Sequence, residues 1–278
     1  MANNVWFVTG ASKGIGLLLV QQLLTRGYRV GATSRSVEEL VKRVGAASER
    51  FLPLAMEIVD EGSVGKAVAA TRAHFGALDV VVNNAGYGQF GAVEEVSDAE
   101  ARRNYDVNVF GTLNVLRAAL PQLREQRSGH VFNISSIGGL VGGFSGWGVY
   151  CSTKFAVAGL TESLRADLEP LGVKVTLVYP GYFRTEFLTS GSLSRPARRI
   201  AAYAGARESE AAHTDQINGA QPGDPVKAAR ALIDVYERAD APLHLLLGSD
   251  AVSMAEKKLQ QVQQELGALR ALSVSTDF

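Results

Sequence analysis

Tyr150 and Lys154 stand four residues apart in the run VYCSTKFAVAGL, whose pattern predicts a buried helix. Residues at this spacing lie on one face of a helix, so both side chains can reach one small ligand. A free phenol has a pKa of about 10, and a nearby ammonium group stabilises the phenolate and lowers that value. The pair can therefore do acid–base chemistry at Tyr150, although a surface ring beside a solvated charge would show the same spacing.

The N-terminal run NVWFVTGASKGIGLLLVQQLL predicts a strand, a glycine turn and a helix. The stretch VWFV suits a buried parallel strand, and a helical pattern begins at Leu17. Gly10, Gly14 and Gly16 let the backbone approach a diphosphate closely, and the helix N-terminus behind them supplies unpaired N–H groups. The spacing G-x-x-x-G-x-G differs from the commoner G-x-G-x-x-G, and a purely structural turn is the alternative to a dinucleotide site.

Apolar runs alternate along the chain with stretches long enough for crossover helices. The runs are VWFV, YRVGATS, FLPLAM, LDVVVNN, GHVFNIS, VKVTLVYP and LHLLLG. This alternation predicts an α/β fold with a Rossmann-like, doubly wound, seven-stranded parallel sheet, in a single domain over residues 1–278. Residues 186–225 are rich in Ala, Ser, Arg and Gly, a composition that predicts mobility rather than a defined shape.

The composition argues against several kinds of partner. A chain of 278 residues, 46% of them apolar, can bury a full core. Its 28 basic and 28 acidic residues cancel, which leaves no electrostatic basis for binding nucleic acid or an anionic membrane. The first strand begins at once, without a signal peptide, and no apolar stretch reaches the roughly 20 residues that span a bilayer, so a cytoplasmic protein is expected. Cys151 is the single cysteine and the four histidines are scattered, so neither a disulfide nor a metal site is expected.

Further motifs accompany the glycine turn and the Tyr150–Lys154 pair. They are NNAG at 83–86, Asn108 in YDVNVFG, Ser136 in NISSIGG, and Pro180 with Gly181 in YPGYFRTEF. In order and spacing, residues 4 to 190 resemble the short-chain dehydrogenase/reductase family. The spellings T-G-x-x-x-G-x-G and Y-x-x-x-K are similar to those of its classical branch.

The resemblance has one departure, at the serine. Ser136 precedes Tyr150 by fourteen residues, where the family usually has one residue fewer. The extra residue would lie in the glycine-rich stretch 138–148. Ser135 is therefore a second candidate for the catalytic serine.

The resemblance also implies a reaction, in which hydride passes between a nicotinamide and a ketone or secondary alcohol. Tyr150 would be the general acid, Lys154 would lower the pKa of Tyr150 and hold the nicotinamide ribose, and Ser136 would donate a hydrogen bond to the substrate oxygen. Asn108 would hold a water that passes protons to Lys154. Ser136 could instead be a turn hydroxyl, and Asn108 a helix-kinking amide bonded to the backbone.

The second strand indicates which dinucleotide binds. In many NAD-binding folds an acidic residue about 20 positions after the glycine turn holds the ribose hydroxyl, but the strand here ends in ATSR, with Ser34 at the expected place. Arg35 and Lys13 suit a 2'-phosphate, so NADP(H) is predicted. The alternative is that both cations are solvated and pair with Glu38 and Glu39. By resemblance, the cofactor-binding set comprises Gly10, Ser12, Lys13, Gly14, Ile15, Gly16, Ser34, Arg35, Glu57, Ile58, Asn84, Ala85, Gly86, Tyr150, Lys154, Pro180, Gly181 and Thr185.

The substrate is less defined by the sequence. An apolar or aromatic ketone is suggested by Phe144, Trp147, Tyr182, Phe183, Phe187 and Tyr203, which could equally be core residues. A basic cluster at Arg195, Arg198 and Arg199 could meet an acidic substrate or solvent. By resemblance, the variable segment 186–225 would cover the substrate. An epimerase or dehydratase with bound nicotinamide, and a catalytically silent nucleotide-sensing or scaffold protein, are the alternatives to a reductase.

The C-terminal stretch predicts an amphipathic helix over residues 250–272. Its apolar stripe consists of Val252, Ala255, Leu259, Val262, Leu266 and Leu269. The stripe could fold onto its own domain, cover the substrate entrance, or meet a neighbouring subunit. Because the family commonly forms dimers or tetramers, a homodimer or homotetramer is expected.

Overall fold

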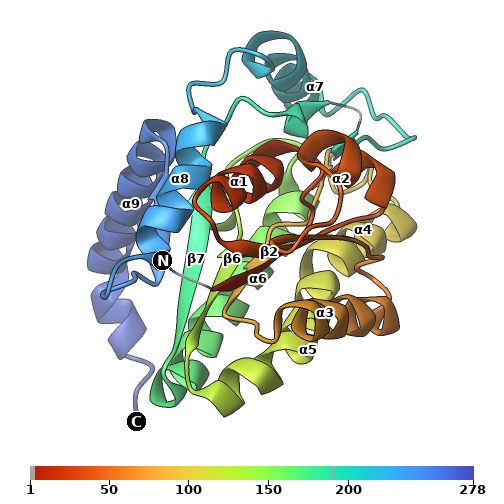
Figure 1. Cartoon of the computed structure of the whole chain (residues 1–278). Helices are drawn as coiled ribbons and strands as arrows, with labels where there is room; N and C mark the ends of the chain where they lie inside the picture. The colour runs from red at the N-terminus through yellow and green to blue at the C-terminus, as the bar shows by residue number, and fades with distance from the viewer. Residues whose placement is uncertain (1–3, 190) are drawn as a thin grey trace.

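The computed structural model of the chain describes residues 4–189 and 191–278. Seven parallel strands form one sheet in the order β3-β2-β1-β4-β6-β7-β9, which confirms the predicted Rossmann-like architecture (Figure 1). The strands are β1 (Val5–Val8), β2 (Arg29–Ser34), β3 (Phe51–Ala55), β4 (Val80–Asn83), β6 (Gly129–Ile134), β7 (Val173–Pro180) and β9 (His244–Leu247). The strand order reverses between β1 and β4, and a crevice for ligands opens at such a reversal.

Helices cover both faces of the sheet. One layer consists of α1 (Gly14–Thr25), α2 (Val37–Val44) and α8 (Pro225–Tyr236), and the other of α3 (Glu61–Phe75), α5 (Gly111–Gln126) and α6 (Gly148–Leu168). The neighbouring residues Trp6 and Phe7 point to opposite faces of β1 and both are fully buried, one in each layer's core. Burial on both faces explains why the strands are continuous apolar runs rather than alternating patterns.

Between residues 186 and 225 the described part of the chain forms several short elements, and the mobility of this segment stays a prediction. The segment contains η4 (Glu186–Leu188), β8 (Leu193–Ser194), which pairs with β5 (Gly88–Gln89), α7 (Ala204–Ala211) and the π-helix η5 (Ala212–Ile217). Arg207 pairs with the buried carboxylate of Glu95, and Arg195 and Arg199 both pair with Glu210, at 2.8 and 3.0 Å. These ion pairs connect the segment to itself and to the body, and they give Arg195 and Arg199, two of the three arginines of the basic cluster, a carboxylate partner within the protein.

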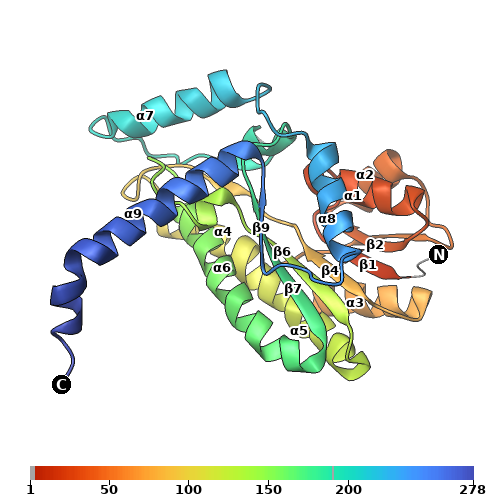
Figure 2. The same cartoon turned by 90° about the vertical axis from the view of Figure 1, so that its left-hand side faces the viewer.

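The C-terminal helix α9 (Ser249–Val274) leaves the body of the molecule (Figure 2). Ala251 and Ala255 are buried at its start, whereas Leu259 and Leu266 are 63% and 58% exposed. The stripe therefore does not fold onto its own domain beyond Ala255, and among the described residues none of α9 lines the large cavity described below.

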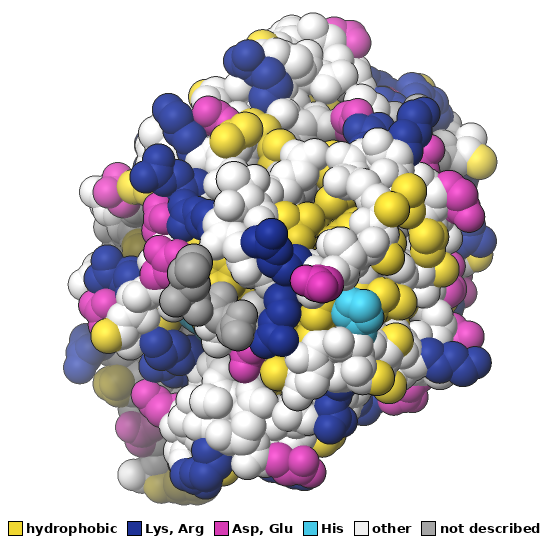
Figure 3. All heavy atoms as spheres, viewed as in Figure 1, with side chains coloured by type: hydrophobic (Ala, Val, Ile, Leu, Met, Phe, Trp, Pro, Cys, Tyr) yellow, Lys and Arg dark blue, Asp and Glu magenta, His cyan; other side chains and the backbone are white. Residues whose placement is uncertain are grey.

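Charged side chains of both signs share the surface of the molecule (Figure 3). Basic and acidic side chains are interspersed over the face seen in Figure 3, so neither sign of charge dominates that face. Within residues 4–189 and 191–278, no helix is both long and apolar enough to cross a bilayer. The same part of the chain holds no cluster of three or more His, Cys, Asp or Glu side chains suited to a metal ion.

Candidate active site

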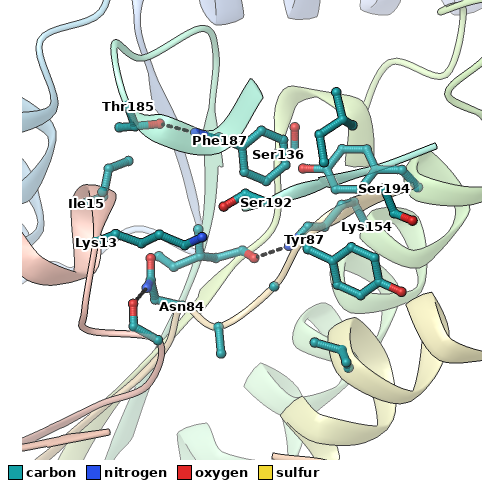
Figure 4. A pocket seen from close by; sticks show the side chains of 18 of the residues that line it. Lys13, Ile15, Asn84, Tyr87, Ser136, Lys154, Thr185, Phe187, Ser192 and Ser194 are labelled. Carbon is teal, nitrogen blue, oxygen red and sulfur yellow. Dashed lines mark hydrogen bonds between the residues drawn. The ribbon is translucent and has the colours of Figure 1, made fainter. Parts of the chain in front are cut away.

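A cavity of about 1150 Å³ lies along the carboxyl ends of the central strands. In Figure 4, Lys13, Ile15 and Asn84 lie at one end of it, and Ser136 and Lys154 at the other. The predicted residues that line it are Gly10, Ser12, Lys13, Gly14, Ile15, Ser34, Arg35, Glu57, Ile58, Asn84, Ala85, Gly86, Ser136, Tyr150, Lys154, Pro180, Gly181 and Thr185. Gly16 and Asn108 are not part of the lining.

The three glycines of the first turn have different physical roles. Gly10 and Gly14 have φ values of +64° and +57°, which L side chains rarely adopt. A Cβ on Gly10 would lie 2.7 Å from the Cα of Ala85, and one on Gly16 would lie 2.7 Å from the carbonyl oxygen of Gly10. A Cβ on Gly14 would find nothing closer than Thr185, at 3.7 Å. Gly14 thus faces open cavity at the N-terminus of α1, where a phosphate can reach backbone N–H groups, whereas Gly16 lets α1 pack closely against the turn, and its part in cofactor binding stays a prediction.

Asn84 and Thr9 hold this turn in place. The Asn84 side chain donates to the carbonyl oxygens of Thr9 and Gly10, at 2.9 and 3.0 Å. The Thr9 hydroxyl accepts from the backbone N–H groups of Asn84 and Ala85, both at 3.0 Å. The side chain of Asn84 is therefore directed at the turn, and Thr9, which the sequence analysis did not single out, aligns the two loops.

A group of cations lies beside the end of β2. The pKa of Lys13 lies below its usual value, chiefly because the side chain is partly buried, and the nearby charges of Arg35 and Arg43 lower it further against an opposing effect of Glu186. Lys13 donates a 2.6 Å hydrogen bond to the carbonyl oxygen of Gly191. The positive charges of these side chains disfavour one another, and a bound anion would relieve that repulsion.

The acidic residues of α2 do not neutralise this group. Glu38 accepts from the Ser36 hydroxyl at 2.7 Å, and Glu39 lies 3.8 Å from Arg43. The suggested pairing of Glu38 and Glu39 with Lys13 and Arg35 was therefore wrong. Arg35 is exposed at the cavity wall and forms no ion pair within residues 4–189 and 191–278. Together with the open turn at Gly14, these residues fit a dinucleotide that carries an additional phosphate.

At the other end of the cavity, Tyr150 and Lys154 extend from the first turns of α6, and both are nearly fully buried. The Lys154 Nζ atom lies 5.9 Å from the centroid of the Tyr150 ring and donates to the carbonyl oxygen of Ile134 at 2.9 Å. Burial lowers the pKa of Lys154 to about 8. Burial also raises the pKa of Tyr150, against an opposing hydrogen bond from Ser136. Desolvation disfavours the charged forms of both residues, so the net pKa of Tyr150 lies above its usual value, and a lowering contribution from Lys154 stays a prediction.

Adjacent serines follow β6 and differ in what they contact. The Ser135 hydroxyl donates to the carbonyl oxygen of Lys154 at 2.9 Å and is buried against α6. The Ser136 hydroxyl accepts from the N–H of Gly138 at 3.1 Å and interacts with Tyr150. Of the two candidates, Ser136 is the one whose hydroxyl meets Tyr150.

Asn108 lies behind the cavity in the π-helix η1 (Asp106–Phe110), which joins α4 (Asp98–Tyr105) to α5. Its side chain accepts from the N–H of Tyr87 and donates to the carbonyl oxygen of Tyr87 and to the hydroxyl of Thr153, each at 3.0 Å. This is the arrangement of a helix-distorting amide bonded to backbone, the alternative that its sequence context left open. Any part it has in proton transfer stays a prediction.

Aromatic side chains form the wall around Tyr150. The ring centroids of Trp147 and Phe187 each lie 5.7 Å from that of Tyr150. Gly138 packs against this wall, since a Cβ on it would come within 3.1 Å of Cys151 Sγ, closer than an ordinary contact. Predicted aromatic residues in the lining are Phe144, Trp147, Tyr182, Phe183 and Phe187, whereas Tyr203 bonds to Glu94 outside the cavity. His213 also lines the cavity; the sequence analysis missed it because it is one of many polar residues in the run RESEAAHTDQIN, which carries no recognisable motif.

Comparison with known proteins agrees with this geometry. The profile of the short chain dehydrogenase family matches residues 4–195. The chain is similar to Oxidoreductase BOA17 of Botryotinia fuckeliana, with 34% identity over 98% of this chain and 99% of that protein.

Solved structures are similar over the full length as well. A short-chain dehydrogenase from Streptomyces avermitilis is 37% identical, covers 100% of both chains and superposes with a TM-score of 0.90. A short chain dehydrogenase from Burkholderia cenocepacia in complex with NADP is 27% identical, with a TM-score of 0.69 over 99% of this chain and 98% of that one. Another chain of the same fold was solved in complex with NAD. The chain therefore belongs to the classical short-chain dehydrogenase/reductase family of oxidoreductases.

Proposed function

We propose that the protein is an NADP(H)-dependent carbonyl reductase or alcohol dehydrogenase that acts on a ketone or the corresponding secondary alcohol. The observation that carries the proposal is the joint placement of Ser136, Tyr150 and Lys154 in one cavity, whose other end holds the open glycine turn and its cations. Ser136, Tyr150 and Lys154 can activate a carbonyl, and the glycine turn with its cations can hold a nucleotide phosphate.

In this proposal the nicotinamide, when bound, supplies the hydride. Tyr150 gives its proton to the carbonyl oxygen as negative charge develops there, and the raised pKa of Tyr150 keeps that proton in place before reaction. Ser136 donates a hydrogen bond to the same oxygen. Lys154 holds the ribose hydroxyls of the cofactor and provides a positive charge near Tyr150.

Preference for NADP(H) over NAD(H) rests on Arg35 and Lys13. Both line the cavity where β2 ends, and the strand carries no acidic residue there that would repel a 2'-phosphate. A solved relative that holds NADP supports the proposal, although the fold accommodates NAD too. Glu57 and Ile58 would flank the adenine, and Pro180, Gly181 and Thr185 would lie near the nicotinamide.

The experiment that tests the proposal is a screen of ketones and aldehydes for loss of NADPH absorbance, with the alcohol product quantified. A reductase consumes one NADPH for each alcohol that forms. An epimerase or dehydratase that keeps its nicotinamide would convert substrate without net loss of NADPH, and a silent scaffold would bind NADPH and convert nothing. Either result would replace the proposed function.

We also propose that the chain assembles as a homodimer or homotetramer in which α9 contributes to the interface. Beyond Ala255 the stripe exposes Leu259, Val262, Leu266 and Leu269, which are between 45% and 63% exposed. A run of exposed leucines on a projecting helix is unfavourable in water, and a second copy of α9 could cover it.

A further inference from the structure

The cavity wall near Tyr150 contains a hydrogen-bonded pair, Tyr182 and His213, which the proposed reaction does not use. Tyr182 follows β7 in the sequence PGY, and His213 belongs to η5 in the segment that covers the site. The Tyr182 hydroxyl oxygen and the His213 Nε2 atom are 2.9 Å apart, and both residues line the cavity.

The second nitrogen of His213 determines which partner donates. His213 Nδ1 lies 2.7 Å from the carbonyl oxygen of Ser209, and because a carbonyl only accepts, Nδ1 carries the proton. Burial lowers the pKa of His213, so the ring is neutral at pH 7 and Nε2 is bare. The Tyr182 hydroxyl must therefore donate to Nε2. Its pKa is raised by burial to about 12, so it keeps this proton at neutral pH.

The consequence is an oxygen of fixed polarity. With its single proton held by His213, the Tyr182 hydroxyl offers the cavity only lone pairs, so it can accept a hydrogen bond but cannot donate one. A ligand hydroxyl or N–H group would satisfy it. A ligand carboxylate, ether or carbonyl oxygen has only lone pairs to offer, so it would be repelled by the Tyr182 oxygen.

This acceptor faces the same chamber as the proposed acid. The Trp147 ring contacts both groups of residues, with its centroid 4.9 Å from that of His213, the partner of Tyr182, and 5.7 Å from that of Tyr150. The thiol of Cys151 is close enough to both hydroxyls that a charge on it would raise the pKa of either. A ligand whose carbonyl meets Tyr150 could therefore place a second group against Tyr182 in the same cavity.

We propose that the substrate is an apolar ketone that bears a hydroxyl group, or another hydrogen-bond donor, distant from the carbonyl, and that Tyr182 accepts from this donor. The inference rests on the proposed function, since it takes the position of the carbonyl from Tyr150. It narrows the aromatic-ketone class suggested by Trp147 and Phe187 to ketones with a distal donor.

Binding of two matched ketones to the NADP⁺-saturated protein tests the proposal without turnover. The probes are para-hydroxyphenylacetone and para-methoxyphenylacetone, with dissociation constants from calorimetry. We expect the wild-type protein to bind the hydroxyl compound roughly threefold to tenfold more tightly, the effect of one hydrogen bond, and Tyr182→Phe to lose this preference. Tyr179→Phe is the matched control, because the Tyr179 hydroxyl also meets a histidine, His244, but lies outside the cavity lining.

Each result bears on the proposal. A wild-type protein that binds both ketones equally, or neither, overturns it, and so does a preference that persists in Tyr182→Phe. Loss of the preference in Tyr182→Phe with retention in Tyr179→Phe supports it. If the preference is as expected but neither ketone is reduced with NADPH or NADH, the proposed function fails while the donor site stands.

Discussion

Ser135 donates its hydroxyl proton to the carbonyl oxygen of Lys154, at 2.9 Å, and this bond separates the roles of two adjacent serines. The hydroxyl of Ser135 is committed to the backbone of α6, whereas that of Ser136 interacts with Tyr150. Ser135 thus anchors α6, whereas its neighbour Ser136 has a hydroxyl that can reach the substrate.

Replacing each serine in turn tests this division. Ser136→Ala should lower kcat/KM for ketone reduction by roughly 10²- to 10³-fold, the loss expected for one hydrogen-bond donor to a developing oxyanion, with little change in Tm. Ser135→Ala should remove the second hydrogen bond to a carbonyl inside α6 and cost about 1 kcal/mol of stability, with the smaller effect on kcat/KM. The assignment of Ser136 is wrong if the two kinetic effects are reversed.

The cofactor proposal predicts the effect of a charge reversal at Arg35. Arg35→Asp should replace a phosphate partner with a phosphate repeller, and should shift the ratio of kcat/KM for NADPH over NADH by at least about tenfold toward NADH. Lys42→Asp is the control, because Lys42 is an exposed cation of α2 outside the cavity lining. A wild-type preference for NADH would contradict the proposal outright.

Burial of Lys154 predicts a pH dependence. Its pKa is lowered to about 8, so the positive charge near Tyr150 is present below that pH and is lost as the pH rises through it. We expect kcat/KM for ketone reduction to be constant below about pH 7 and to fall above about pH 8, because the group loses its proton there. A profile that stays level to pH 10, near the ordinary lysine pKa, would mean that desolvation does not set this titration.

Truncation of the C-terminal helix tests the proposed assembly without removing buried residues of the domain. Truncation after Lys258 removes Leu259, Leu266 and the rest of the exposed stripe, but keeps Ala251 and Ala255 in their buried positions. Light scattering should show a dimer or tetramer for the full chain and a smaller species for the truncated one. A monomeric full chain would refute the assembly, and an unchanged oligomer after truncation would place the interface elsewhere.

Local patterns in the sequence were sufficient to predict the sheet and most of the cavity. A strand such as VWFV is buried on both faces and so reads as an uninterrupted apolar run, and the φ values of Gly10 and Gly14 require the residue type that marks the turn. The features that could not be predicted depend on contacts between distant segments. Arg207 pairs with Glu95, more than a hundred residues earlier in the chain, and His213 of η5 lines the cavity beside residues of β7 and α6. Likewise the pKa of Tyr150 depends on burial, which spacing alone does not give.

The central claim is that Tyr150 delivers the proton in a hydride-transfer reaction, and substitution of its hydroxyl tests it most directly. Tyr150→Phe keeps the ring that packs against Trp147 and Phe187, so the affinity for NADPH, measured by fluorescence titration, should stay within about twofold. The kcat for reduction of the best ketone should fall by about 10²- to 10⁴-fold. Near-normal kcat in Tyr150→Phe, with NADPH still bound, would contradict the account.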